Sequence, residues 1–121
     1  MGKFSKAAVM TAAQKIEVFQ LPIPEVRDDG MLIKMDFASI CGSDTHVYKE
    51  VPPHAFIMGH ELTGTVIEMG KNANKRINCF YGPLNVGDRI ALYPSVTCGK
   101  CYNCLTYGNG SYSMCDNAFA F

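Results

Sequence analysis

Four of the six cysteines lie within eighteen residues, and this stretch carries the clearest chemical signal in the sequence. They are Cys98, Cys101, Cys104 and Cys115. Structural zinc prefers four ligands in a tetrahedron, and short spacers let neighbouring thiolates reach one ion. The spacing therefore predicts a closed structural zinc site in a lobe of about residues 94–118. Such a site would be architectural, because four protein ligands leave no open coordination position.

Two other interpretations of the cysteine cluster are a disulfide framework and unconnected cysteines in a core. Disulfides belong to oxidising compartments, whereas Ala7–Ala13 gives way to Gln14 and Lys15 and is too weak for a secretory signal. No stretch approaches the roughly 18 apolar residues of a membrane span. We therefore expect a cytoplasmic protein with reduced thiols. Core cysteines would have apolar neighbours, but Lys100 and Asn103 lie within this cluster.

A second group of possible ligands lies earlier in the chain. Cys41 and His60 are nineteen residues apart and could supply two of the three protein ligands of a catalytic zinc, which keeps a position for substrate oxygen or water. Asp44 could orient the ring of His60, as ligating histidines usually require. One cysteine and one histidine are more often ordinary core or loop residues, so the spacing alone favours that interpretation over a catalytic zinc site.

The composition limits the class of protein to which these residues belong. The chain has 121 residues, about one domain, of which 48% are apolar and 18% charged. Eleven Lys and Arg balance eleven Asp and Glu, so the sequence shows neither a basic footprint for nucleic acid nor an acidic, disordered tail. We expect a globular domain without a nucleic-acid or membrane partner.

Short β-type segments must position these ligands, because no long amphipathic helix is apparent. The predicted strands are Ile16–Leu21, Met31–Ile40, Leu62–Met69 and Ile90–Leu92. Gly64 predicts a bend or bulge, and Ser43 or Asp44 could cap one short helix. Asn72–Pro83 is expected to be an exposed excursion. Several short strands separated by turns predict a mainly β fold, either a small barrel or a sandwich.

Several motifs together resemble a known family. They are Cys41-Gly42-Ser43-Asp44-x-His46, Gly59-His60-Glu61-Leu62-x-Gly64-x-Val66-x-x-x-Gly70, Val86-Gly87-Asp88-Arg89 and the cysteine lobe. In this order they resemble the N-terminal part of the zinc-dependent medium-chain alcohol dehydrogenases, over nearly the whole chain. The resemblance implies a GroES-like, partly closed β-barrel with short helices and a zinc-binding lobe. Residues 1–121 would be this catalytic domain, truncated at its C-terminal end.

The resemblance also assigns roles to the second group of residues. It implies that Cys41 and His60 bind a catalytic zinc and that Glu61 is an occasional ligand or a neighbour of the ligands. Asp44 would accept a hydrogen bond from the ring of His60. Ser43 would stand at the substrate oxygen and pass its proton outward, with His46 as a later member of the relay. The four cysteines of the lobe would hold the structural zinc.

The activity implied by the resemblance is the reversible oxidation of an alcohol or polyol to a carbonyl compound. Zinc would act as a Lewis acid on the substrate oxygen, and hydride would pass between the substrate carbon and NAD or NADP. The family therefore implies one structural zinc, one catalytic zinc, a nicotinamide cofactor and a small-molecule alcohol or carbonyl substrate. It also implies a homo-oligomer at full length.

Some parts of such an enzyme are not found in the sequence. No G-x-G-x-x-G follows a strand, so a Rossmann domain and dinucleotide site are lacking. Family members take a third catalytic zinc ligand from beyond the cysteine lobe, and their barrel has further strands after the position of Phe121. We therefore expect the front portion of a longer enzyme, inactive by itself. The alternatives are a stand-alone zinc-binding module and a non-catalytic remnant.

The sequence departs from the family pattern in two places. Leu105–Met114 is a longer spacer than usual before the last cysteine, but the extra residues should cost only about 0.3 kcal/mol in loop closure. The segment 71–84 is also long, and we expect an inert surface insertion rather than a contribution to the substrate mouth or an oligomer contact. His54 and Cys79 match no motif and are predicted to be bystanders.

Overall fold

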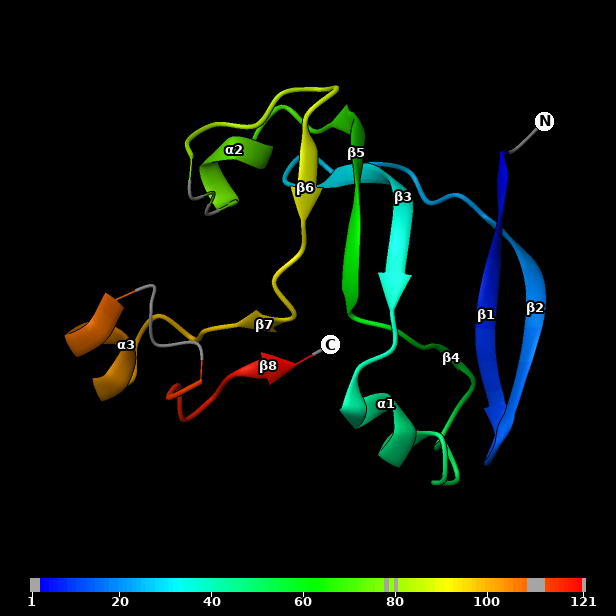
Figure 1. Cartoon of the computed structure of the whole chain (residues 1–121). Helices are drawn as coiled ribbons and strands as arrows, with labels where there is room; N and C mark the ends of the chain where they lie inside the picture. Colours follow the sequence, from blue (N-terminus) through cyan, green and yellow to red (C-terminus); the bar gives the residue numbers. More distant parts are fainter. Residues whose placement is uncertain (1–2, 78, 80, 109–112, 121) are drawn as a thin grey trace. The chain divides into compact units, whose positions relative to one another are not determined.

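The structure is a computed structural model that describes residues 3–77, 79, 81–108 and 113–120 (Figure 1). The chain divides into two compact units, Met1–Ala91 and Leu92–Phe121. Strands make up most of the regular structure, which confirms the predicted mainly β class. Within the described ranges, no helix is long and apolar enough to cross a membrane.

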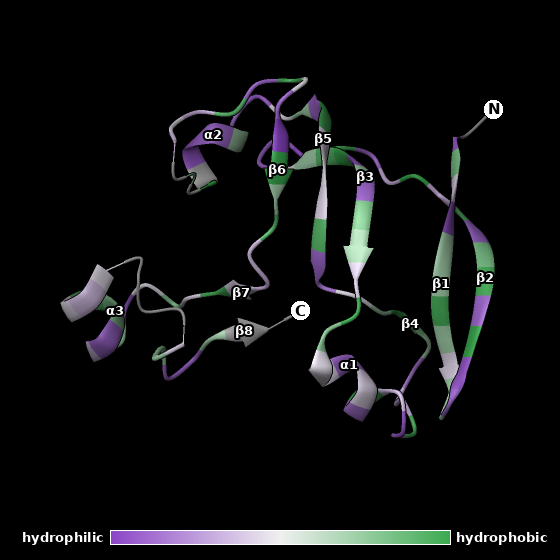
Figure 2. Ribbon diagram, in the orientation of Figure 1, coloured by the Kyte–Doolittle hydropathy of each residue, from purple (hydrophilic) through white to green (hydrophobic). Residues whose placement is uncertain are grey.

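The first sheet of unit 1 is built around an N-terminal hairpin. Strand β1 (Phe4–Ala12) pairs antiparallel with β2 (Lys15–Pro22) on one side and with the short β4 (Phe56–Ile57) on the other. Hydrophilic and hydrophobic residues alternate along β2, as its period of two requires (Figure 2). The prediction of a strand at Ile16–Leu21 is confirmed. The prediction missed β1, although its Val9 and Met10 belong to the core.

The second sheet of unit 1 carries the predicted middle strands. It has the antiparallel order β3-β5-β6, formed by Met31–Ser39, Glu61–Met69 and Arg89–Ala91. A register shift between Met35 and Phe37 places a bulge in β3 opposite Gly64. A side chain at Gly64 would come 2.5 Å from the carbonyl oxygen of Lys34, so the close approach of the two strands requires glycine there.

Helix α1 (Gly42–Val47) begins directly after β3, and its start differs from the prediction. The N-cap is Cys41, which has extended backbone angles, rather than Ser43 or Asp44. Asp44 instead stands in the first turn, and its carboxylate accepts a hydrogen bond from the backbone N–H of Cys41 at 2.8 Å. This is the reciprocal arrangement of a capping box, in which a residue inside the helix completes the cap.

The segment expected to be an exposed excursion is anchored to unit 1. It contains the short helix α2 (Ala73–Arg76), and Ala73 is only 1% exposed. The side-chain amide of Asn74 donates to the carbonyl oxygen of Leu84 at 2.9 Å and accepts from its N–H at 2.8 Å. Residues 78 and 80 of this segment lie outside the described residues. The expected inertness of this segment stays a prediction.

The two sheets of unit 1 are separate, so the strands described do not close a barrel. The core is correspondingly small: Met10 and Val66 are its fully buried large side chains, whereas Phe37 on β3 is 72% exposed.

Unit 2 contains the cysteine lobe. Strand β7 (Ser95–Val96) pairs antiparallel with β8 (Phe119–Ala120), and helix α3 (Tyr102–Tyr107) lies between them in the chain. Cys101 is the N-cap of α3, and Cys104 is its buried residue. Residues 109–112, within the predicted lobe, lie outside the described residues. Two short strands and one helix therefore hold the segments that carry the cysteines.

Candidate functional site

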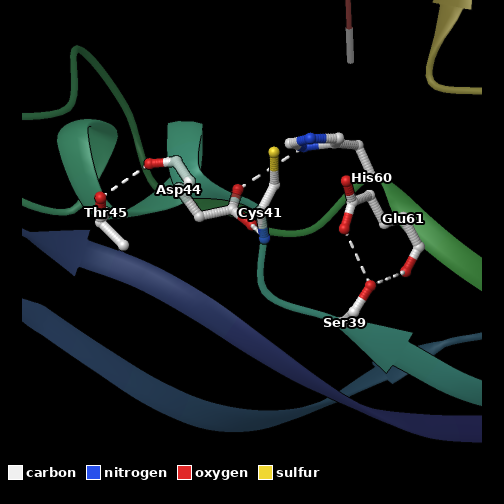
Figure 3. Close-up of polar contacts among 7 residues, drawn as sticks. Ser39, Cys41, Asp44, Thr45, His60 and Glu61 are labelled. Atoms are coloured by element: carbon white, nitrogen blue, oxygen red, sulfur yellow. Dashed lines mark hydrogen bonds and ion pairs between the residues drawn. The ribbon is translucent and has the colours of Figure 1, made fainter.

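Pairing between β3 and β5 brings Cys41 and His60 together although they are nineteen residues apart. The last pair of this ladder is Ser39 with Glu61. Cys41 follows Ser39 by two residues, and His60 immediately precedes Glu61, so both lie at the same end of the sheet. Cys41, His60 and Glu61 each offer a ligand atom, and these atoms lie within 4.8 Å of one another (Figure 3). The antiparallel ladder is therefore what assembles this cluster.

The carboxylate of Asp44 joins the two sides of the cluster. One oxygen, Oδ2, accepts the hydrogen bond from the backbone N–H of Cys41. The other, Oδ1, lies 3.5 Å from Nδ1 of His60, and the two side chains are only 14% and 13% exposed. The expected position of Asp44 beside the ring is thus seen in the structure. With Nδ1 facing a carboxylate, Nε2 is the ring nitrogen left for a metal.

Two other residues fix the start of β5 and the residue before it, His60. Gly59 has a φ of +104°, a left-handed backbone conformation that favours glycine, directly before His60. Ser39 donates a hydrogen bond through its hydroxyl to Oε2 of Glu61 at 2.9 Å (Figure 3). Sequence reasoning missed Ser39. The available signal was its place two residues before Cys41, at the end of an alternating segment. The sequence did not show that Glu61 is its pairing partner.

Ser43 and His46 are on α1 and are exposed. In the part of the chain that the structure describes, neither side chain makes a hydrogen bond to Cys41, His60 or Glu61. The structure therefore brings together four of the predicted residues of this site, Cys41, Asp44, His60 and Glu61. The proton relay through Ser43 and His46 stays a prediction.

The two predicted bystanders belong to neither metal-ligating cluster. His54 is exposed on the segment before β4, and Cys79 is half-buried.

The four cysteines of unit 2 form a compact cluster of sulfur atoms. Their Sγ atoms all lie within 4.8 Å of one another, and those of Cys98 and Cys104 are 4.0 Å apart. Four sulfurs at the usual Zn–S length define a tetrahedron with edges of about 3.8 Å. None of the six cysteines, each in the described part of the chain, is in a disulfide, so the disulfide interpretation does not hold. The donor set fits zinc by element, number and spacing.

Hydrogen-bond donors in the lobe favour negative charge on sulfur. The backbone N–H groups of Lys100 and Cys101 lower the pKa of the Cys98 thiol to about 6. The N–H of Cys98 donates to Sγ of Cys115 at 3.3 Å and favours that thiolate. Burial and the thiols of Cys104 and Cys98 outweigh this donor and raise the pKa of Cys115 to about 11. In the metal-free lobe, Cys98 therefore loses its proton readily while Cys115 keeps its own. A bound cation would favour the thiolate form of both.

The sequence of the chain is similar to a family model and to several known dehydrogenases. Residues 27–121 match the family model of the alcohol dehydrogenase GroES-like domain. The chain is 37% identical to the sorbitol dehydrogenase of Bacillus subtilis over 116 residues, which are 91% of this chain and 30% of that protein. It is 35% identical to the sorbitol dehydrogenase of Bombyx mori over 115 residues, 90% of this chain and 30% of that protein.

Solved structures give the same answer for the fold. A crystal structure of an alcohol dehydrogenase from Thermotoga maritima superposes with a TM-score of 0.79 at 26% identity, covering 99% of this chain and 33% of that one. The galactitol-1-phosphate dehydrogenase of Escherichia coli gives 0.76 at 25% identity, with 97% and 32% covered. The chain spans about a third of the length of these relatives. It belongs to the alcohol dehydrogenase GroES-like domain family, in the zinc-dependent medium-chain alcohol dehydrogenases.

Proposed function

We propose that the chain forms the metal-binding and alcohol-binding part of a dehydrogenase that interconverts an alcohol or polyol and its carbonyl compound. The observation that carries this proposal is the cluster of Cys41, His60 and Glu61 with the Asp44 carboxylate against the ring of His60. One thiol, one imidazole and one carboxylate are a typical donor set of a catalytic zinc. The proposal is further supported by the names of the relatives, which include sorbitol and L-threonine 3-dehydrogenases.

Cys41 and His60 would hold the zinc, with Glu61 as a further or alternating ligand. When bound, the zinc would supply Lewis-acid chemistry at the oxygen of the alcohol. Asp44 keeps the His60 ring in one orientation, because its carboxylate faces Nδ1. Its second oxygen ties the backbone of Cys41 in place, so both ligands are held before the metal arrives.

Ser43 and His46 would carry the proton of the substrate hydroxyl to solvent. Ser43 immediately precedes Asp44 in the first turn of α1, close in the chain to the proposed ligand Cys41. His46 is in the last turn of the same helix and is exposed. An imidazole accepts a proton on one ring nitrogen and donates one from the other, so His46 would pass the proton on to water.

The four cysteines of unit 2 would bind a second zinc with a structural role, in a lobe of about residues 94–118. Residues 1–121 would thus form the N-terminal GroES-like part of the enzyme, while the site for NAD or NADP lies outside them. We also propose a cytoplasmic homo-oligomer for the complete enzyme, since reduced thiols suit that compartment. The substrate would be a small alcohol or polyol, a class that fits the sorbitol and galactitol-1-phosphate dehydrogenases among the relatives.

The test is carried out on the complete protein that contains this chain. It should bind two zinc ions per chain and reduce NAD+ or NADP+ with at least one member of a panel of polyols and secondary alcohols. Cys41→Ser should remove one zinc and abolish turnover, whereas the matched variant Cys79→Ser should keep both zinc ions and the rate. Ser43→Ala should lower the rate and leave the zinc content intact.

Two results would contradict the proposal. Two bound zinc ions without turnover of any alcohol would favour a non-catalytic remnant. A single zinc that persists in Cys41→Ser would favour a zinc-binding module that keeps only the structural lobe.

A further inference from the structure

We propose that Ser39 is a positioning residue that fixes Glu61 as a ligand of the metal at Cys41 and His60. The inference rests on the proposed function, because it requires a metal at that site. It goes further by assigning a specific task to a residue that the motifs do not include. The hydroxyl of Ser39 would hold one carboxylate oxygen of Glu61, so that the other oxygen is presented to the metal.

The β3–β5 register explains why these two residues meet. Ser39 and Glu61 are the last directly paired residues of the antiparallel ladder, where opposite side chains lie on the same face. The hydroxyl of Ser39 lies 2.9 Å from Oε2 of Glu61 and 3.5 Å from its backbone carbonyl oxygen. Figure 3 shows the hydroxyl directed toward one carboxylate oxygen and the backbone oxygen of Glu61. One donor thereby restrains both the side chain and the backbone of the proposed ligand.

Glu61 needs such a restraint because its side chain is long and its site is crowded with electron-rich atoms. A carboxylate oxygen of Glu61 lies within 4.8 Å of the Cys41 sulfur and a nitrogen of His60. Without a metal, the sulfur of Cys41 gives this carboxylate no attractive partner, and a glutamate without a restraint would turn toward water. Among the residues described, Ser39 is the one that hydrogen-bonds this carboxylate. Its hydroxyl therefore opposes that movement.

The hydrogen bond also affects how Glu61 can bind a metal. A carboxylate can offer one or two oxygens to a cation. Because Oε2 accepts the hydrogen bond from Ser39, binding of the metal through Oε1 alone is favoured. Loss of the hydroxyl should therefore change both the affinity of the site and the number of ligand atoms. Hydrogen-bond partners of metal ligands commonly contribute about 10- to 100-fold in metal affinity.

The experiment uses the complete protein that contains this chain and cobalt(II) as the probe. One equivalent of zinc first fills the four-cysteine site, which keeps zinc in preference to cobalt. Cobalt is then titrated, and the thiolate-to-cobalt absorption that disappears in Cys41→Ser reports on the second site alone. Ser39→Ala should weaken cobalt binding by about tenfold and change the ligand-field spectrum. Ser39→Thr, which keeps a hydroxyl, should restore both.

Two comparisons separate positioning from a general loss of structure. Thr65 makes a similar hydrogen bond in the same ladder, from its hydroxyl to Oδ2 of Asp36 at 3.4 Å, so Thr65→Val should leave cobalt binding unchanged. In a Glu61→Ala background, Ser39→Ala should cause no further loss of affinity, since the residue would have nothing left to position.

The inference is overturned if Ser39→Ala binds cobalt with the affinity and spectrum of the unaltered chain. It is equally overturned if the loss persists in full in the Glu61→Ala background. A chain that shows no absorption dependent on Cys41 would instead contradict the proposed metal site, and the role of Ser39 with it.

Discussion

Asp44 and His60 form the contact that links the start of α1 to the proposed metal site. Oδ1 of Asp44 lies 3.5 Å from Nδ1 of His60, and Oδ2 accepts the backbone N–H of Cys41 at 2.8 Å. One carboxylate therefore completes the helix cap and orients a ligand. Helix formation and ligand placement are coupled through this residue, because a change in either would move the same side chain.

The two tasks of Asp44 can be separated by substitution. Asp44→Asn keeps an oxygen for the Cys41 N–H but removes the negative charge beside His60. We expect the zinc affinity of this site to fall about 10- to 100-fold while α1 remains formed. Asp44→Ala should lose the helix cap as well, so it should also lower the free energy of unfolding by about 1 kcal/mol. Competition with a chromophoric chelator measures the affinity, and urea unfolding measures the stability.

Equal zinc affinities for Asp44→Asn and the unaltered chain would show that His60 is oriented by something else. The zinc of the cysteine lobe provides an internal control, because it should remain bound in both variants.

The sequence predicted the residues that gather in the two clusters and the place of Asp44 beside His60, but it did not reveal the contact between Ser39 and Glu61. The spacing of the four cysteines was enough to predict their cluster, whereas Cys41 and His60 were favoured as ligands only by the resemblance to a known family. Ser39 was missed because its partner Glu61 is twenty-two residues away and the pairing depends on strand register. The register is itself altered by two shifts in the β3–β5 ladder, which alternation of apolar residues does not reveal.

Removing one thiol from the cysteine lobe should release its zinc. Cys104 is the most buried of the four and lies 4.0 Å from Cys98, sulfur to sulfur. Cys104→Ser should therefore lower the zinc content by one ion per chain and lower the free energy of unfolding of unit 2, since structural zinc supplies much of the folding energy of small lobes. Zinc analysis by mass spectrometry and circular dichroism check these outcomes.

Cys79→Ser is the matched control for the lobe, because it also removes one thiol but lies outside both clusters. It should retain all bound zinc. A Cys104→Ser chain with full zinc content would contradict the structural assignment, as would an unaltered chain whose stability does not depend on zinc.

The zinc affinity of the lobe should rise with pH, and its pH dependence should be steeper below about pH 6. Zinc binds thiolates, so every thiol that carries a proton in the metal-free lobe must release it on binding. The pKa of Cys115 is raised to about 11, so this thiol releases a proton throughout the neutral range. The pKa of Cys98 is lowered to about 6, so Cys98 adds a further proton only in acid. Chelator competition at several pH values measures both slopes.

Alkylation offers a separate check of the same pKa difference. In the metal-free chain at neutral pH, iodoacetamide should modify Cys98 before Cys115, because the thiolate is the nucleophile. Peptide mapping identifies the modified residue. Equal rates for the two thiols, or a single slope of zinc affinity across pH 6, would contradict the assigned pKa directions.

The strands that alternate clearly were predicted, and those without this pattern were not. Met31–Ser39 and Glu61–Met69 alternate or are rich in β-branched residues between glycines. In contrast, β1 contains Ser5, Lys6 and three alanines, and it becomes a strand because β2 and β4 supply hydrogen bonds on both sides. The two-residue strands β7 and β8 depend in the same way on a distant partner. Tertiary pairing, rather than local propensity, defines these elements.

Gly64, the glycine of β5, should tolerate substitution poorly, because the neighbouring strand β3 lies close against it. A Cβ at this position would come 2.5 Å from both the Lys34 carbonyl oxygen and Cγ2 of Ile33. Backbone atoms cannot give way without disturbing the ladder, so Gly64→Ala should lower the free energy of unfolding by about 1–3 kcal/mol. Gly42→Ala is the matched control, since a Cβ there meets nothing within 4 Å and Gly42 is helical. It should be neutral or stabilise the chain by up to about 1 kcal/mol. Urea unfolding of the two variants decides the matter: equal effects would mean that strand packing at Gly64 is looser than the close approach requires.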